Sequence, residues 1–343
     1  MIDFRYHLVS IVAVFLALAI GIVLGSTELQ GKAFDALRQT SNSLSSKLTA
    51  AQRQSDSYAA QVAADQQFAQ ANESVLLDRL LDGQRVVLVT EPGAQQSVVT
   101  GVEAAARDAG ATITGTVALQ SKFNDTTGTT EAGLNDINGN LAANTSTTLV
   151  TGADQQTANQ QQAAQLIATA VTSKSLSSQT GLTLAEAQTV LNSYGEAGFI
   201  SVSGQPQLGA TLAIIVTPQS PPSDGSSDPA NQVLVAVATE FASKSGATVV
   251  AANTSGSGAG SALTVLRSSS VSGQVSTIDN ADTASGQITV IQALARQLQG
   301  GKAAAYGVQS GATAAGPSPA PTPSATVSAS ASPSSTKKAK GNK

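Results

Sequence analysis

The chain has 343 residues, of which 41% are hydrophobic and only 12% are charged, with 18 basic and 22 acidic side chains. A net charge of −4 without a dense basic patch excludes a protein that binds nucleic acid by displacing counterions. The chain has no cysteine, one histidine and one methionine, which excludes a disulfide scaffold, a thiolate metal site and a cysteine nucleophile.

A membrane-spanning helix is predicted at the N-terminus. Residues 8–25 read LVSIVAVFLALAIGIVLG, and Ser10 is the only polar residue among them. At about 1.5 Å per residue, this run nearly crosses a hydrocarbon core of about 30 Å. Phe4 and Tyr6 precede it, and aromatic side chains favour the headgroup region. We therefore predict a membrane anchor over residues 1–27.

The alternative is a cleaved signal peptide, because Val23 and Gly25 are small residues at the spacing that cleavage requires. The apolar run is longer than a usual signal peptide core, and Arg5 is the only firmly basic side chain before it. These features favour an uncleaved, single-pass protein of the cell membrane or envelope. We expect its N-terminus in the cytoplasm and the bulk of the chain outside, although the charges beside the span encode this orientation weakly.

A coiled-coil stalk is predicted over residues 28–83. Between Leu37 and Leu81 there is no Pro or Gly, and apolar residues recur in two rows that interleave at spacings of 3 and 4. Asp65 and Asn72 fall in these rows and weaken them. We expect the seam to bind a second copy of the chain or another envelope protein; the alternative is a single helix that packs on its own domain. The seam consists of Leu37, Leu44, Leu48, Ala51, Tyr58 and Val62.

Residues 84–310 alternate between strand and helix patterns. The run Arg85–Thr90 (RVVLVT) is typical of a buried parallel strand, and a helix and a strand at Thr112–Leu119 complete a βαβ unit. The pattern predicts a doubly wound, mainly parallel, Rossmann-like α/β domain. Further strands are expected at 199–202, 211–216 and 248–252, a weak one at 148–151, and helices near 155–172, 184–194, 232–244 and 287–299.

The last segment, residues 311–343, is rich in Pro, Ser and Ala and carries terminal lysines. Such a composition cannot bury enough apolar surface to fold, so we expect it to be disordered.

Two loops of the domain are candidate sites. Asp279, Asn280 and Asp282 could hold a hard cation or form a surface loop at a partner-binding lip, but the spacing is not that of an EF-hand, and a turn or a capped helix start is favoured. Residues 256–261 could cradle a phosphate. However, Ser261 replaces the third glycine of GxGxxG and no P-loop lysine is present, so a flexible loop is favoured.

Catalytic machinery is not expected. The only histidine, His7, lies before the membrane segment, where an interfacial anchor is favoured over a metal ligand, so no Ser-His-Asp set can form. We predict no enzyme activity, no cofactor and no metal site.

Four segments resemble one protein family. They are MIDFRYHLVSIVAVFLALAIGIVLG at the start, RVVLVTEPGA at 85–94, TVVAANTSG at 248–256 and VSTIDNADTASGQITVIQALARQLQGGKAAAYG at 275–307. In this order they resemble the actinobacterial family named for the mycobacterial copper transport protein B, MctB. The resemblance implies an envelope protein tied to copper homeostasis. It also implies kinship with relatives in daughter-cell separation, where a coiled-coil stalk and an envelope domain bind partner proteins.

Copper requires Cys, Met or His ligands, and the chain has none beyond the membrane segment. We therefore expect an indirect or partner-dependent role in copper homeostasis. The alternatives are an interaction protein of the envelope in daughter-cell separation, and a pore or transporter subunit, for which the span offers only Ser10 as a polar lining residue. A nucleotide-binding or enzymatic α/β domain is a further alternative.

Overall fold

The computed structural model describes residues 4–151, 156–175, 181–218, 228–254 and 260–318, without the side chains of residues 26–33. The chain divides into two compact units, Met1–Phe68 and Ala69–Lys343.

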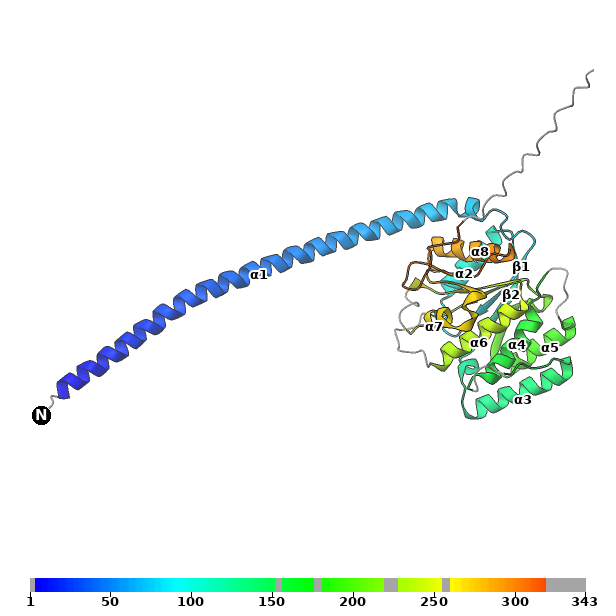
Figure 1. Ribbon diagram of the computed structural model, residues 1–343, viewed down its shortest axis with the longest axis horizontal. Helices are drawn as coiled ribbons and strands as arrows, with labels where there is room; N and C mark the ends of the chain where they lie inside the picture. The colour runs from blue at the N-terminus through cyan, green and yellow to red at the C-terminus, as the bar shows by residue number, and fades with distance from the viewer. Residues whose placement is uncertain (1–3, 152–155, 176–180, 219–227, 255–259, 319–343) are drawn as a thin grey trace, which may run out of the picture. The chain divides into compact units, whose positions relative to one another are not determined.

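One continuous helix, α1 (Phe4–Leu77), includes the predicted membrane segment from Phe4 and the predicted stalk as far as Leu77; residues 78–83, also assigned to the stalk, form turns (Figure 1). Its first part, Phe4–Gly25, is long and apolar enough to cross a membrane, and none of that window is buried. The predicted apolar helix is therefore confirmed in length and composition, and its role as an uncleaved anchor stays a prediction. A single chain does not show the pairing of a coiled coil, so that part of the interpretation stays a prediction.

The second unit is built on a seven-stranded sheet with the order β3-β2-β1-β4-β5-β6-β7. All neighbouring strands are parallel except β2 and β3. The strands are β1 (Arg85–Thr90), β2 (Thr112–Leu119), β3 (Ile200–Gly204), β4 (Leu212–Val216), β5 (Ala247–Ala251), β6 (Val275–Ile278) and β7 (Ala305–Tyr306).

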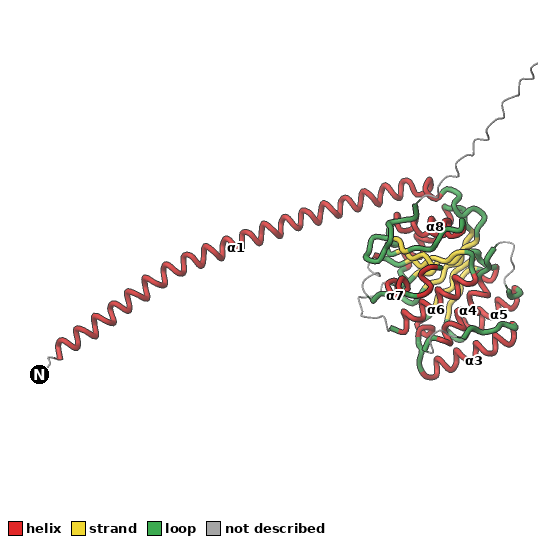
Figure 2. The backbone as a smooth tube through the Cα atoms, in the orientation of Figure 1, coloured by secondary structure: helices red, strands yellow, loops and turns green. Residues whose placement is uncertain are grey.

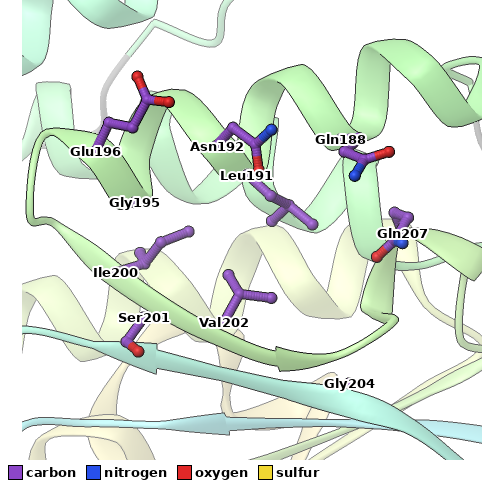
Figure 3. Close-up of a pocket in the computed structure, with 10 residues that line it drawn as sticks. All are labelled: Gln188, Leu191, Asn192, Gly195, Glu196, Ile200, Ser201, Val202, Gly204 and Gln207. Carbon is purple, nitrogen blue, oxygen red and sulfur yellow. The ribbon is translucent and has the colours of Figure 1, made fainter.

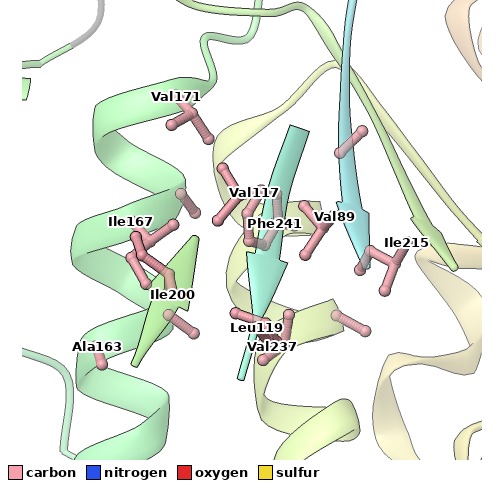
Figure 4. Close-up of a cluster of buried hydrophobic side chains, with 14 of the residues drawn as sticks. Val89, Val117, Leu119, Ala163, Ile167, Val171, Ile200, Ile215, Val237 and Phe241 are labelled. Carbon is pink, nitrogen blue, oxygen red and sulfur yellow. The ribbon is translucent and has the colours of Figure 1, made fainter. Parts of the chain in front are cut away.

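Helices cover both faces of this sheet (Figures 1 and 2). Strand alternation explains this arrangement: Val87 and Val89 of β1 belong to one buried cluster and Val86 and Leu88 to the other. The first cluster lies under α3 (Gly128–Thr145), α4 (Ala158–Val171), α5 (Leu184–Glu196), α6 (Pro229–Lys244) and α7 (Ala262–Ser268), as Figure 4 shows in part. The second lies under α2 (Gln96–Asp108), α8 (Ala284–Leu298) and the end of α1. The doubly wound, mainly parallel fold is thus confirmed.

The end of α1 belongs to the α/β unit. Ala69 and Leu77 are buried in the cluster beneath α2 and α8, together with Leu81 just beyond the helix. The compact unit therefore begins at Ala69, before the residue 84 at which the sequence predicts the domain to start.

Strand β3 lies where the sequence predicts a strand but runs against the sheet. Its start lies beside the end of β2, where the Gln120 N–H donates to the Phe199 carbonyl. The chain reaches this point directly from α5 through Gly198, whose φ of +75° permits a tight turn. β3 therefore starts at the edge of the sheet where β2 ends and runs back along β2, so the two strands pair antiparallel.

Two expectations are wrong. Residues 148–151 form no strand; instead the Val150 N–H donates to Gln165 Oε1 of α4 at 2.9 Å. Residues 311–318, expected to be disordered, return along β7: the Thr313 N–H donates to the Ala305 carbonyl, and Ala314 bridges to Tyr306. The rest of the predicted disordered segment, residues 319–343, lies outside the described residues.

Candidate functional site

An apolar strip runs along the part of α1 that belongs to the first compact unit. The strip consists of Leu37, Leu44, Leu48, Ala51, Tyr58 and Val62. Leu37, Leu44 and Leu48 are 65%, 67% and 65% exposed, and Tyr58 and Val62 are more than half exposed. Ala51 is exposed on the same strip. A contiguous exposed apolar surface is typical of an interaction site. All six predicted seam residues therefore remain available for a partner.

The strip has a defined end. Ala69 continues the row of Leu48 and Val62, but it is only 8% exposed because it packs in the core of the α/β unit. Glu73 lies one turn further, and partial burial, with the nearby Asp108 carboxylate, raises its pKa. Ala69 is therefore not part of the exposed strip.

The cluster at 279–282 is placed differently from the prediction of a surface loop. Asp279 is fully buried and pairs with Arg267, whose Nη2 lies 3.0 Å from Asp279 Oδ2. Asp279 Oδ1 also accepts the N–H of Val308 at 2.7 Å. Gly307 has a φ of +132°, and a Cβ there would overlap the Asp279 carboxylate. Asp279 is thus an internal anchor for the segment after β7.

The other two residues of that cluster have separate environments. Asn280 is buried, and its Oδ1 has no hydrogen-bond partner in the part of the chain that the structure describes. Asp282 is exposed and accepts two bonds of 2.8 Å from the N–H and hydroxyl of Thr254. Thr283 caps α8 by accepting the Gly286 N–H, as the interpretation of a capped helix start predicts. A role of this loop in binding a partner stays a prediction.

The carboxyl edge of the sheet is the usual ligand site of a doubly wound fold. The strand order reverses between β1 and β4, and there Ala94 and Pro218 pair in an antiparallel bridge. A Cβ at Gly93 would lie 3.3 Å from the Cβ of Pro218, so the two loops are in close contact. Ala94 and Pro218 therefore lie close together at the position where a Rossmann fold holds its dinucleotide.

Glu91, directly after β1, is an acidic residue that sequence reasoning missed. It is 5% exposed, its Oε1 has no partner among the described residues, and burial raises its pKa to about 8. The available sequence signal was the continuous apolar run RVVLVT directly before Glu91, which is typical of a buried strand.

The described residues contain no group of three or more His, Cys, Asp or Glu side chains that could hold a metal ion. Most of the candidate phosphate loop lies outside those residues, and Ser261 at its end caps α7 by accepting the Thr264 N–H. His7 lies on the exposed first turns of α1.

Comparison with known proteins gives a family match over nearly the whole chain. The matching family model is described as the copper transport outer membrane protein MctB, and it covers residues 1–317. The copper transporter MctB of Mycobacterium tuberculosis (strain ATCC 25618 / H37Rv) is 30% identical over 220 residues, which are 63% of this chain and 67% of that protein. The copper transporter MctB of Mycobacterium bovis matches equally. That of Mycobacterium leprae (strain TN) is 32% identical over 129 residues, 38% of this chain and 41% of the relative.

Proposed function

Because the chain belongs to the family of the copper transport outer membrane protein MctB, we propose that it serves copper transport as a membrane-anchored interaction protein and not as an enzyme. The observation that carries this proposal is the combination of a membrane-length helix with an exposed apolar strip on its continuation. The α/β domain has no His-containing catalytic set, because the only histidine is His7.

In this proposal a partner protein, and not this chain, binds the copper. Cu(I) is bound in proteins by thiolate, thioether or imidazole ligands. Beyond His7 the sequence has no Cys, Met or His. The carboxylates and amides of the domain are hard ligands, which suit Mg²⁺ or Ca²⁺ rather than Cu(I). The contribution of this protein is therefore to hold or position another component.

We further propose that this partner is recruited through the strip from Leu37 to Val62, and that a second copy of the chain is the first occupant. Two copies anchored in one membrane by the same helix are parallel and aligned, which raises their effective concentration. The proposed location is the cell envelope, with the N-terminus in the cytoplasm and the α/β domain outside. A role as a scaffold in daughter-cell separation uses the same strip and is the second candidate.

The test separates transport from metal binding. Cells that lack this protein are expected to accumulate copper, and the wild-type gene is expected to restore the normal content. The seam variant with Leu44→Asp and Leu48→Asp is expected to fail, although it is inserted and folded. The full chain in detergent is expected to take no stoichiometric Cu(I) from a high-affinity chelator. Stoichiometric uptake, or full restoration by the seam variant, would contradict the proposal.

The purified full chain also tests the alternative that this protein forms a pore. The span has Ser10 as its only polar residue between Leu8 and Gly25, which is a poor lining for a copper pathway. Liposomes that contain the full chain alone are therefore expected to show no copper flux above that of empty liposomes.

A further inference from the structure

A hollow of about 300 Å³ opens at the carboxyl edge of the sheet, between the loop after β1 and the end of β2. Its walls are residues 90–94, Gln96 and Val99 of α2, and residues 118–121. Leu119 belongs to the first buried cluster and Val99 to the second. The hollow is therefore lined from both faces of the sheet.

Glu91 is the ionisable side chain of this hollow, since none of the other residues that line it can carry a charge. It is 5% exposed, and its Oε1 has no hydrogen-bond partner among the described residues. An unpaired carboxylate is costly to bury, so burial raises the pKa of Glu91 to about 8, with no contribution from a charged neighbour. Near neutral pH the side chain is therefore a neutral acid, which can donate its proton in a hydrogen bond.

The first turn of α2 adds backbone donors. α2 has 13 residues, its N-cap residue Gln95 makes no side-chain cap bond, and no acidic residue lies in its first turn. The N–H groups of Gln96 and Ser97 belong to that turn, whose amides have no carbonyl partner within the helix. The turn is also the positive end of the helix dipole. Gln96 lines the hollow, so this end of α2 borders it.

A buried neutral acid and the start of a helix without a side-chain cap both supply donors to one small hollow. We propose that the hollow binds a small oxyanion, the carboxylate or phosphate group of a small molecule, through the first-turn amides of α2 and the Glu91 carboxyl group. A volume of about 300 Å³ is at the lower end of the range for small-molecule sites, which suits such a ligand. This inference is independent of the copper role and of the strip on α1.

A larger hollow of the same domain lacks these features. A groove of about 430 Å³ lies between α5 and β3, and Figure 3 shows Leu191, Ile200 and Val202 pointing toward one another at its floor. None of the residues that line this groove has a buried polar atom without a partner. Its ionisable side chain, Glu196, is exposed. The unpaired buried acid therefore distinguishes the hollow beside Glu91.

A cation is the alternative occupant, because an ionised Glu91 could accept a hydrogen bond from an ammonium group. Two features favour the anion. No second acidic residue lines the hollow, and the positive end of α2 repels a cation.

Calorimetric titration of the full chain in detergent tests the proposal with two probes, sodium sulfate and sodium acetate. The measurements are made one pH unit below and one above about 8, a range over which both probes keep their charge. At the lower pH at least one anion is expected to bind; sulfate indicates a phosphate group as the ligand, and acetate alone a carboxylate. At the higher pH the affinity is expected to be about tenfold lower, because most of the Glu91 side chains have lost the proton. Failure of both anions to bind at the lower pH would overturn the proposal.

Glu91→Gln separates an anion site from a cation site. The glutamine keeps a hydrogen-bond donor and cannot ionise, so this variant is expected to bind the anion with equal affinity at both pH values. Loss of anion binding in the folded variant would overturn the donor role of Glu91. Binding of methylammonium by the wild-type chain, lost in Glu91→Gln, would show a cation site and would also overturn the proposal.

A matched pair of variants tests the position of the anion. Gln96→Asp places a carboxylate in the first turn of α2, where it favours the helix but repels an anion, so at least tenfold weaker binding is expected with the urea midpoint maintained. Asn192→Asp adds the same charge in the groove beside β3 (Figure 3) and is expected to leave binding unchanged. Equal weakening in both variants would show an effect of net charge, and unchanged binding in Gln96→Asp would place the anion elsewhere. Either result would overturn the proposal.

Discussion

Arg267 and Asp279 form an ion pair inside the α/β domain, with 3.0 Å between Nη2 and Oδ2 and with side chains that are 9% and 0% exposed. Arg267 also donates from Nε to the Thr277 hydroxyl at 2.9 Å and from Nη2 to the Tyr306 carbonyl at 2.9 Å. The pair therefore joins α7 to β6 and β7.

Asp279→Ala is expected to lower the free energy of unfolding of the α/β domain by about 3–5 kcal/mol, because it leaves a buried guanidinium without its partner. Urea unfolding of the full chain in detergent measures this change. Asp282→Ala is the matched control, since Asp282 is exposed and, among the residues that the structure describes, bonds to Thr254 alone; its expected cost is about 0.5–1.5 kcal/mol. Equal effects of the two variants would contradict the anchoring role of Asp279.

Glu91 predicts a pH dependence of stability. Burial raises its pKa from 4.5 to about 8, so the folded chain holds a proton that the unfolded chain releases above pH 4.5. The protonated Glu91 therefore contributes to the free energy of unfolding. This contribution is fully present below the pKa of Glu91 in the unfolded chain, falls as the pH rises toward its pKa in the folded chain, and is lost above that value. Glu91→Gln is expected to remove this fall in stability. The measurement is the urea concentration at the midpoint of unfolding, taken at several pH values between 4.5 and about 8. The exposed Glu196→Gln is the control; an unchanged pH profile in Glu91→Gln would contradict the burial argument.

Much of this fold could be predicted from apolar runs and turn signals, because strands such as RVVLVT are continuous and are bounded by Gly or Pro. Helix α3 was missed because its sequence has no clear apolar face; its buried residues are Leu134, Asn138 and Leu141. β6 was missed because only Val275 and Ile278 are apolar in its four residues. These elements depend on tertiary contacts that a local pattern does not encode.

The candidate sites also differ in how much of them the sequence could predict. Helical spacing places the heptad residues on one face of α1, but their role as a seam stays a prediction, because every side chain from Phe34 to Asp65 is exposed. The polar cluster at 279–282 could not be assigned from spacing, because the partner of Asp279 is Arg267 on another element. The antiparallel pairing of the edge strand β3 could not be predicted either, since it depends on which strand lies beside β3 in the sheet.

A buried hydroxyl supports the layer of α3 and α5. The Tyr194 hydroxyl donates to Asn138 Oδ1 at 2.6 Å, and burial raises the Tyr194 pKa, so the hydroxyl keeps its proton. Tyr194→Phe leaves the Asn138 oxygen without a partner and is expected to lower the free energy of unfolding by about 1–3 kcal/mol. Thermal or urea unfolding measures this. The exposed Tyr58→Phe is the control, and an equally stable Tyr194→Phe would show that the bond contributes nothing net.

The strip on α1 predicts a parallel pair of chains in register. Ser41 and Ser55 share a heptad row with Leu48 and Val62, so in such a pair each serine lies opposite its own copy. The flanking positions oppose no like charges there; for example, Lys47 of one copy lies opposite Gln52 of the other. Asp65 falls in the other heptad row, with Leu37 and Leu44, so in such a pair the two Asp65 carboxylates would lie opposite each other and repel. The seam is therefore limited to the residues before Asp65.

Because the chain has no cysteine, single substitutions give a clean test of this pairing. Ser41→Cys and Ser55→Cys in the full membrane-anchored chain are each expected to form a disulfide-linked dimer under mild oxidation. Ser46→Cys, on the opposite side of the helix, is the matched control and is expected to remain a monomer. Adding Leu44→Asp and Leu48→Asp to Ser55→Cys is expected to abolish the dimer while the α/β domain stays folded, since these side chains lie outside its core. Equal crosslinking at all three serines would indicate random collision in the membrane. No crosslinking at Ser41 and Ser55 would show that the strip serves a different protein, and self-association would be withdrawn.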